Sequence, residues 1–533
     1  YMDGMWDSIF SFDRGRYFKK RPQHRRFPVT VAFGAPQKPE EATVAWAHQA
    51  ILDLSALAFA NRTKKLREPL EIALIRALKR GPWRTMFVEH GKSIRRMKRS
   101  QVLGTAIALA RRWIKYPLDE QEKRIAVLLP AGPAPAMINL GLVLIGKTPV
   151  NVPFELIDDD LAVAGFSRTL NDIGVRTVIT SKVFVPRLAD VWEAEEGRFI
   201  DMTKEIRAAG SVRVLLERIR AWIEPLFVTR WRLSLSENAR DGEQDEAIGL
   251  VADVTRPAVF LTGLEVQKNA AQVLAGNFLN ADDRVFSDLP LNKPEGVQLG
   301  LWAPLLSGKG TVINRSFQKK LTPGEIESVA TAENADVIAI DHAGFEQILE
   351  DRSAWNRNAE ASNPWIALFG RNYDPARVEE LEKLAGMPVC RGWGSNVIGQ
   401  VVAMSLPHPN VGEIRPPFEE QVGYDPKAVG RLLPGITARI DREPAQLTEC
   451  GDLSLHAPLA FARKVLNPNH SEEDSENEDI PPKKPTPPLT PSENCEMRID
   501  PVELTNQPCW IVVADRARFA RNGLLFLDEE AAP

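Results

Sequence analysis

Short apolar runs alternate with helix-like segments through the middle of the sequence, and this alternation limits the possible folds more than any other feature. The runs predicted as strands cover residues 124–130, 147–153, 175–181 and 335–341, and the helix-like segments cover 134–146, 161–174 and 342–352. Strands that alternate with helices of this length form β-α-β units, whose strands are parallel. The sequence therefore predicts an α/β fold with a largely parallel sheet.

The chain has 533 residues, which is too long for one compact core and predicts several domains or subdomains. Apolar residues make up 44% and charged residues 26%, as in ordinary soluble proteins. No apolar run is long enough for a membrane span, and the start at Tyr1 has neither methionine nor a signal-peptide pattern, so we expect part of a longer cytoplasmic protein. The four cysteines lack metal-binding or C-x-x-C spacing, which favours a reducing compartment and no metal site.

The net charge of −4 is unevenly distributed along the chain. Residues 1–124 hold 26 Lys and Arg against 12 Asp and Glu, a local charge of +14, so the remaining residues carry −18. A basic end of this size favours an anionic partner, either nucleic acid or a membrane surface, although a solvated basic face remains the alternative.

An acidic and then proline-rich segment interrupts the last part of the chain. Residues 467–507 contain HSEEDSENEDIPPKKPTPPLTPSEN and have almost nothing to bury, so we predict a disordered insert. The following residues 508–533 return to a strand, a turn at Asn522-Gly523 and a second strand. We expect this final piece to pack back onto the preceding domain.

Residues 4–34 read GMWDSIFSFDRGRYFKKRPQHRRFPVTVAFG. This run resembles the closing portion of glycerophospholipid acyltransferases, which carry similar S-I-F-S-F, K-x-P and P-V-x-V-x-F-G elements. The family's catalytic H-x-x-x-x-D box lies upstream of this portion, so we expect it outside this chain. His48 and Asp53 repeat the spacing within a helix-like segment, where residues five apart point about 140° away from each other. We predict no catalytic role for them.

A second resemblance extends from about Arg84 to Glu529. The stretches that carry it are VEHGKSIRRMKRSQVLGTAIALAR, RIAVLLPAGPAPAMINLGLVLIGKTPVNVPF, GVQLGLWAPLLSGKGTVI, VGRLLPGITARI and CGDLSLHAP. In order and spacing they resemble AMP-forming acyl-activating synthetases, above all the acyl carrier protein synthetase domain that bacteria fuse to a lysophospholipid acyltransferase.

This resemblance implies the large N-terminal domain of that fold, with parallel sheets flanked by helices and a small β-rich subdomain, but without the mobile C-terminal domain. The predicted division is an acyltransferase-like end at 1–65, an acyl-activating-like domain at 66–466, the insert at 467–507 and the last strands at 508–533.

The family's phosphate loop, T-S-G-S-x-G-x-P-K-G, corresponds to FLTGLEVQKNAAQVLA, where only Thr262 and Gly263 match. About half of the loop is deleted, and Glu265 brings negative charge to the same place. Lys268 could reach a phosphate, although a solvated helix lysine is the alternative. We interpret the stretch as the remains of a phosphate site, because the backbone donors that surround a triphosphate are missing.

The family's G-Y-G-x-T-E motif corresponds to Gly392-Trp393-Gly394-Ser395-Asn396-Val397. The glycines predict a turn, and the aromatic residue could pack against adenine. Valine replaces the metal-holding carboxylate, and Mg²⁺ requires oxygen ligands.

The ribose-binding aspartate of the family corresponds to Asp515, and the catalytic lysine of the C-terminal domain has no counterpart in this chain. The resemblance thus implies a vestigial nucleotide pocket made of Thr262, Gly263, Gly392, Trp393, Gly394, Ser395 and Asp515. We predict no catalytic residue, no metal ligand and no cofactor. ATP or AMP with Mg²⁺ would bind only if the chain is an active synthetase.

The segment SVRVLLERIRAWIEPLFVTRWRL predicts an amphipathic helix. Its apolar stripe consists of Val212, Leu215, Ile219, Trp222, Ile223 and Leu226, and its arginines Arg213, Arg218 and Arg220 lie off that stripe. Such a segment either lies in a lipid headgroup region or packs its stripe on the core. Together with the basic first quarter it favours peripheral association with the inner face of the cell membrane.

Three functions are compatible with these features. The first is a non-catalytic acyl-activating module that supports a lysophospholipid acyltransferase in the upstream part of the same protein. It would still hold an acyl chain or nucleotide, and its possible partners are an acyl chain or acyl carrier protein. The second is a working acyl–acyl carrier protein or coenzyme A ligase with unconventional ATP handling. The third is a non-catalytic interaction scaffold that recruits partners through residues 467–507. We expect an anionic phospholipid surface, and no nucleic acid, as a further partner.

Overall fold

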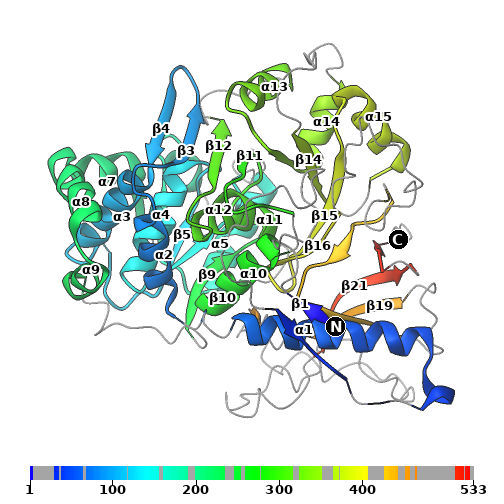
Figure 1. Ribbon diagram of the computed structural model, residues 1–533. Helices are drawn as coiled ribbons and strands as arrows, with labels where there is room; N and C mark the ends of the chain where they lie inside the picture. The colour runs from blue at the N-terminus through cyan, green and yellow to red at the C-terminus, as the bar shows by residue number, and fades with distance from the viewer. Residues whose placement is uncertain are drawn as a thin grey trace, which may run out of the picture.

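Figure 1 shows the structure, a computed structural model of the chain. The residues that it describes are 1–3, 29–34, 36, 38–63, 66, 68–116, 118–154, 160–189, 198–233, 245–253, 258–275, 278–315, 323–350, 364–370, 373–405, 425, 427–441, 451–456, 462–464, 510–520 and 523–527. The predicted insert and Asn522 lie outside these residues.

Nine strands form the larger sheet, in the order β17-β16-β15-β14-β13-β11-β12-β3-β4. The six strands from β15 to β3 run parallel, and at the two edges β4, β16 and β17 each pair antiparallel with the neighbouring strand. The bounds are β3 (Thr85–His90), β4 (Ile94–Lys98), β11 (Arg284–Ser287), β12 (Thr311–Arg315), β13 (Val337–Ile340), β14 (Trp365–Phe369), β15 (Val389–Ser395), β16 (Gln400–Met404) and β17 (Arg431–Leu432). Helices α13 (Pro323–Ala332), α14 (His342–Glu350) and α15 (Pro375–Ala385) connect successive strands.

Seven strands form the second sheet, in the order β20-β10-β9-β6-β5-β7-β8, and the five strands from β9 to β8 are parallel. The bounds are β5 (Arg124–Val127), β6 (Thr148–Asn151), β7 (Thr177–Thr180), β8 (Arg198–Asp201), β9 (Glu246–Leu250), β10 (Val259–Thr262) and β20 (Ala462–Lys464). Its helices are α4 (Pro133–Leu144), α5 (Asp160–Asp172), α6 (Val185–Ala189), α7 (Met202–Ala208), α8 (Ser211–Ile223) and α9 (Leu226–Arg232). The predicted α/β fold with largely parallel sheets is confirmed.

The main core lies between the two large sheets and is filled by helices. These are α2 (Leu70–Lys79), α3 (Arg99–Trp113), α10 (Gly263–Ala275), α11 (Pro294–Val297), the π-helical turn η4 (Gln298–Trp302) and α12 (Ala303–Leu306). Arg99 is fully buried, and its guanidinium donates hydrogen bonds to four backbone carbonyls of α2 and of the segment from α12 to Gly310. Burial lowers the pKa of Arg99 to about 10, but the group stays charged at neutral pH.

Four antiparallel strands form a small third sheet, β18 (Thr437–Asp441), β19 (Gly451–His456), β21 (Trp510–Phe519) and β22 (Leu525–Leu527). Because β21 pairs with β19, the piece after the insert packs back as predicted. Helix α1 (Val44–Thr63) lies against this sheet, and Figure 1 shows the two side by side. The contact is close: a Cβ atom on Gly435 would lie 2.5 Å from the ring of Phe59.

The N-terminal residues form a short ribbon, β1 (Met2–Asp3) with β2 (Thr30–Val31), and a 3-10 turn at Pro39–Glu41. Within the described part of the chain, no helix is both long enough and apolar enough to cross a bilayer. The predicted boundaries after residues 65, 466 and 507 stay predictions.

Candidate functional site

The corner between strand β10 and helix α10 contains Thr262 and Gly263, the two residues matched to the phosphate loop. The strand ends at Thr262 and the helix begins at Gly263, so no loop separates them. Thr262 and Glu265 bond each other reciprocally. The Thr262 N–H donates to Glu265 Oε2 over 2.6 Å, and the Glu265 N–H donates to Thr262 Oγ1 over 3.3 Å. This is a capping box, which satisfies the first backbone donors of the helix.

The capping box places a carboxylate at the end of the helix where a phosphate would bind. The N-terminus of a helix attracts anions because its N–H groups are free and its macrodipole is positive there. In this chain Glu265, which is only 3% exposed, already lies at that position. Lys268 follows within α10 and is partly buried.

Gly392 and Gly394 lie in strand β15, so the predicted turn at these glycines is wrong; the turn comes next, at residues 396–399. Close neighbours fill the space beside both glycines instead. A Cβ atom on Gly392 would lie 2.5 Å from the ring of Phe369, and one on Gly394 would overlap Glu295 Oε2. Trp393 is 4% exposed and packs in the core that β15 and β16 share with α10.

Glu295, at the start of α11, is a second buried acid of this region. Its side-chain atom Oε2 has no hydrogen-bond partner among the described residues. Burial raises the pKa of Glu295 from 4.5 to about 7, and the nearby Lys293 offsets only part of this rise. The carboxyl group is therefore largely protonated below neutral pH, directly beneath Gly394.

Polar contacts bring segments that are distant in the sequence to this corner. Asn269 of α10 donates to the Val401 carbonyl over 2.9 Å and accepts from its N–H over 3.1 Å, so α10 is tied to β16. Asn292 donates to the Val251 carbonyl over 3.0 Å, which ties the segment before α11 to the end of β9. A Cβ atom on Gly399 would lie 3.3 Å from Leu261. The β10–α10 corner and the β15–β16 hairpin are thus one region.

The hairpin itself holds two buried polar side chains. Ser395 and Gln400 face each other as register partners at the ends of β15 and β16, and they are 2% and 1% exposed. Within the described residues, neither the Ser395 hydroxyl nor the Gln400 amide has a hydrogen-bond partner. Buried polar groups without partners call for an explanation, such as a polar ligand.

The positions matched to metal binding carry no acid. Asn396 and Val397 form the hairpin turn, and Val397 is 40% exposed. Among the described residues, no group of three or more His, Cys, Asp and Glu is placed to hold a metal ion. Val397 offers no side-chain oxygen to Mg²⁺, which requires oxygen ligands. Asp515 lies in strand β21, and its side chain is outside the described part of the structure.

His48 and Asp53 make separate structural contacts, and their predicted lack of a catalytic role stays a prediction. The His48 ring packs on Phe519 with centroids 4.8 Å apart, and burial lowers the pKa of the imidazole. Asp53 Oδ1 accepts hydrogen bonds from the Thr437 hydroxyl over 2.6 Å and from Gln49 over 2.9 Å. Both side chains help to dock α1 on the small sheet.

Sequence reasoning missed Glu295. One local signal was present, an acid between Pro294 and Gly296 at the start of a long apolar run, where a solvated side chain is not expected. The contact with Gly394 was not visible, because the two residues are 99 positions apart.

No sequence profile of a known protein family matches the chain. Several solved structures are similar to it. The unliganded O-succinylbenzoate coenzyme A synthetase of Bacillus subtilis has a TM-score of 0.60 and 15% identity, covering 86% of this chain and 78% of that chain. An acyl-CoA synthetase of Brucella canis has a TM-score of 0.61 and 15% identity, covering 86% and 75%. A benzoate CoA ligase of Burkholderia xenovorans LB400 has a TM-score of 0.59 and 17% identity, covering 86% and 79%.

The Bacillus subtilis enzyme has also been solved with AMP, and with ATP and a magnesium ion. At these identities the likeness establishes a common fold and leaves activity as a separate question. The chain has the α/β fold of the large N-terminal domain of AMP-forming acyl-activating enzymes.

Proposed function

We propose that the chain is a non-catalytic acyl-activating module that supports a lysophospholipid acyltransferase. The observation that carries the first half of this proposal is the capping box at Thr262 and Glu265. Formation of an acyl-adenylate needs donors and cations around the triphosphate of ATP. Here a buried carboxylate lies at the helix end that would supply those donors, and it would repel a phosphate.

The residues around the hairpin support the same conclusion. Val397 offers no oxygen to Mg²⁺, and Glu295 places a carboxyl group against Gly394. Loss of a single oxyanion-type donor costs about 10²–10³ in rate, so the combined changes would remove useful adenylation. The acyltransferase half of the proposal rests on the resemblance of residues 4–34 alone.

A working acyl–thiol ligase with unconventional ATP handling is the second candidate. The similar structures favour it, because they are named as synthetases and ligases and one of them was solved with its acyl-adenylate intermediate. The buried Ser395 hydroxyl and Gln400 amide also favour it, since they could bind a nucleotide or an acyl group at the β15–β16 hairpin. ATP or AMP with Mg²⁺ would then be its cofactors.

Release of pyrophosphate separates the two candidates. The unmodified chain is incubated with ATP, Mg²⁺ and a long-chain fatty acid, and a working acyl-CoA synthetase serves as the positive control. The proposal predicts release no faster than in the mixture without protein. Release that depends on the fatty acid and falls in the Ser395→Ala variant would establish the ligase and contradict the proposal.

A further inference from the structure

Helices α8 and α9 expose a continuous apolar face, which we call the docking face. It includes six side chains that are each 49–77% exposed: Leu215, Leu216, Ile219, Trp222, Phe227 and Trp231. Trp83 is 58% exposed and extends the face, because its ring centroid lies 6.0 Å from that of Trp222. An exposed cluster of this kind marks an interaction site in a folded protein.

The position of the stripe bears on one of the two predictions for this segment, the packing of the stripe on the core. The segment is not one helix, because α8 ends at Ile223 and α9 begins at Leu226 after Pro225. Leu226 is partly buried, whereas the other predicted stripe residues are exposed. The core-facing alternative is therefore wrong for α8. Figure 1 shows α8 and α9 at one end of the molecule, on the outer side of α3.

Arginines border the docking face along both sides of α8. At 100° per residue, its exposed apolar side chains fall within an arc of about 120°. On the same wheel Arg218 lies beyond one border, and Arg213 and Arg220 lie beyond the other. Arg213 and, on α9, Arg230 are exposed. A basic amphipathic surface with aromatic residues is the pattern of a helix that lies in a lipid headgroup region.

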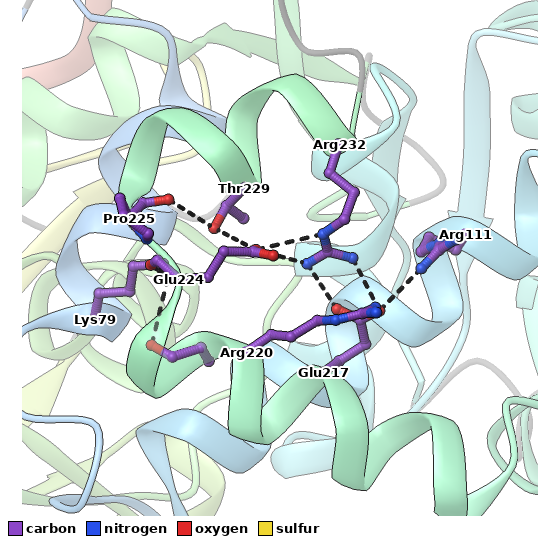
Figure 2. Close-up of polar contacts among 9 residues, drawn as sticks. Lys79, Arg111, Glu217, Arg220, Glu224, Pro225, Thr229 and Arg232 are labelled. Atoms are coloured by element: carbon purple, nitrogen blue, oxygen red, sulfur yellow. Dashed lines mark hydrogen bonds and ion pairs between the residues drawn. The ribbon is translucent and has the colours of Figure 1, made fainter.

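The two acidic side chains of the α8–α9 helix pair point inward, as Figure 2 shows. Glu217 is fully buried and forms ion pairs with Arg111 at 3.0 Å, Arg220 at 2.9 Å and Arg232 at 2.8 Å. Glu224 pairs with the same Arg232 guanidinium at 3.0 Å. Residues 211–232 contain five arginines and two glutamates, a net charge of +3, and both glutamates are engaged on the inner side.

This network also holds the two helices in place. Lys79 of α2 donates to the Glu224 carbonyl over 2.6 Å, and the Thr229 hydroxyl donates to the Glu224 carboxylate over 3.0 Å. The apolar side chains of the docking face make none of these contacts. They can therefore be changed without removing a partner from the buried charges.

An open surface pocket of about 450 Å³ lies beside the docking face where α7 meets α8. Its lining includes Arg111, Arg213, Arg220 and Leu216, and also Glu217. Glu217 is neutralised by Arg111, Arg220 and Arg232, so the lining guanidinium that is offered to a phosphate is that of the exposed Arg213. A lipid phosphate would lie in this pocket while acyl chains contact Leu216.

We propose that the docking face binds the surface of an anionic phospholipid bilayer. The aromatic and aliphatic side chains enter the headgroup boundary, and the bordering arginines pair with lipid phosphates. Two-fold pairing with a second copy fits less well, because it would bring basic borders together. This inference does not depend on the proposed function, since it uses no residue of the nucleotide corner.

Co-sedimentation of the full chain with vesicles tests the proposal. The vesicles are phosphatidylcholine alone, or phosphatidylcholine with about one-third phosphatidylglycerol. We expect the protein to sediment with the anionic vesicles. The variant Trp222→Ser/Phe227→Ser/Trp231→Ser should lose at least about tenfold in partition coefficient. For the variant Arg213→Gln/Arg230→Gln, the partition coefficient should fall about fivefold per arginine on anionic vesicles and change little on neutral ones.

The matched control is Ile94→Ser/Val183→Ser, which removes apolar side chains that are 50% and 76% exposed outside the docking face. It should bind like the unmodified chain, and circular dichroism should show that all variants are folded. The proposal is overturned if the protein does not sediment with anionic vesicles or if the control loses as much binding as the aromatic variant. It is also overturned if light scattering shows a dimer that the aromatic variant dissociates while vesicle binding is absent.

Discussion

Replacement of Glu295 by glutamine should stabilise the protein relative to the unmodified chain, by an amount that increases as the pH rises. Glu295 is 8% exposed, and burial raises its pKa from 4.5 to about 7. Below pH 4.5 the carboxyl is protonated in both states, so it imposes no cost. Between pH 4.5 and about 7 the unfolded chain releases the proton and the folded chain keeps it, so stability falls through this window. The difference of about 2.5 between the two pKa values corresponds to about 3 kcal/mol in the free energy of unfolding.

Glutamine has nearly the same shape and does not titrate, so the variant lacks this loss. Any cost of burying its amide is the same at all pH values and cancels when two pH values are compared. From pH 5 to pH 8 the variant should gain about 2–3 kcal/mol relative to the unmodified chain. With an unfolding entropy of about 2 cal/mol/K per residue over a chain of this size, the gain is about 2–3 °C in Tm.

Scanning calorimetry of both proteins at pH 5, 6, 7 and 8 measures this effect. The control is Glu379→Gln, the same chemical change at an exposed position of α15. The difference in Tm between Glu379→Gln and the unmodified chain should stay constant. If the difference for Glu295→Gln is also constant between pH 5 and pH 8, the carboxyl group is not buried in the way described.

Two further changes test the corner itself. Thr262→Ala and Glu265→Ala should each lower the free energy of unfolding by about 1 kcal/mol, because each removes half of the capping box. In thermal unfolding the double variant should lose less than the sum of the two single losses. Strictly additive losses would mean that the two residues do not interact. Gly394→Ala should cost about 1–3 kcal/mol because its methyl group would meet Glu295, and Glu295→Ala should restore most of that stability in the double variant; a Gly394→Ala variant as stable as the unmodified chain would contradict the contact.

Much of the fold could be predicted from local sequence. The runs at 124–130 and 134–146 became β5 and α4, because apolar residues between glycine or proline positions leave few alternatives. Deletion of about half of the phosphate loop was also predicted, and in the structure helix α10 follows directly on strand β10. These features depend on residues that are close in the chain.

The contacts of the candidate site were less predictable. A glycine pair suggested a turn, yet Gly392 and Gly394 lie in a strand because Phe369 and Glu295 occupy the space of their missing side chains. Such a requirement comes from residues elsewhere in the chain, so no local pattern reveals it. The capping box could have been recognised, since a threonine followed three positions later by glutamate is its signature.

The break between α8 and α9 has a cause in the local sequence that the prediction of a single amphipathic helix did not include. The residue before a proline is biased away from helical geometry, and Pro225 follows Glu224 at the break. By contrast, the inward direction of Glu217 and Glu224 depends on Arg111 and Lys79, which belong to other helices. Only the assembled fold shows that the outer side of the α8–α9 helix pair is an apolar face with basic borders.

The central claim is that the carboxylate of Glu265 takes the place of a phosphate at the start of α10. Isothermal titration of the unmodified chain with ATP and Mg²⁺ tests it most directly. The account predicts no saturable binding, which corresponds to a Kd weaker than about 1 mM. A saturable one-to-one isotherm with a Kd well below that value would contradict the account.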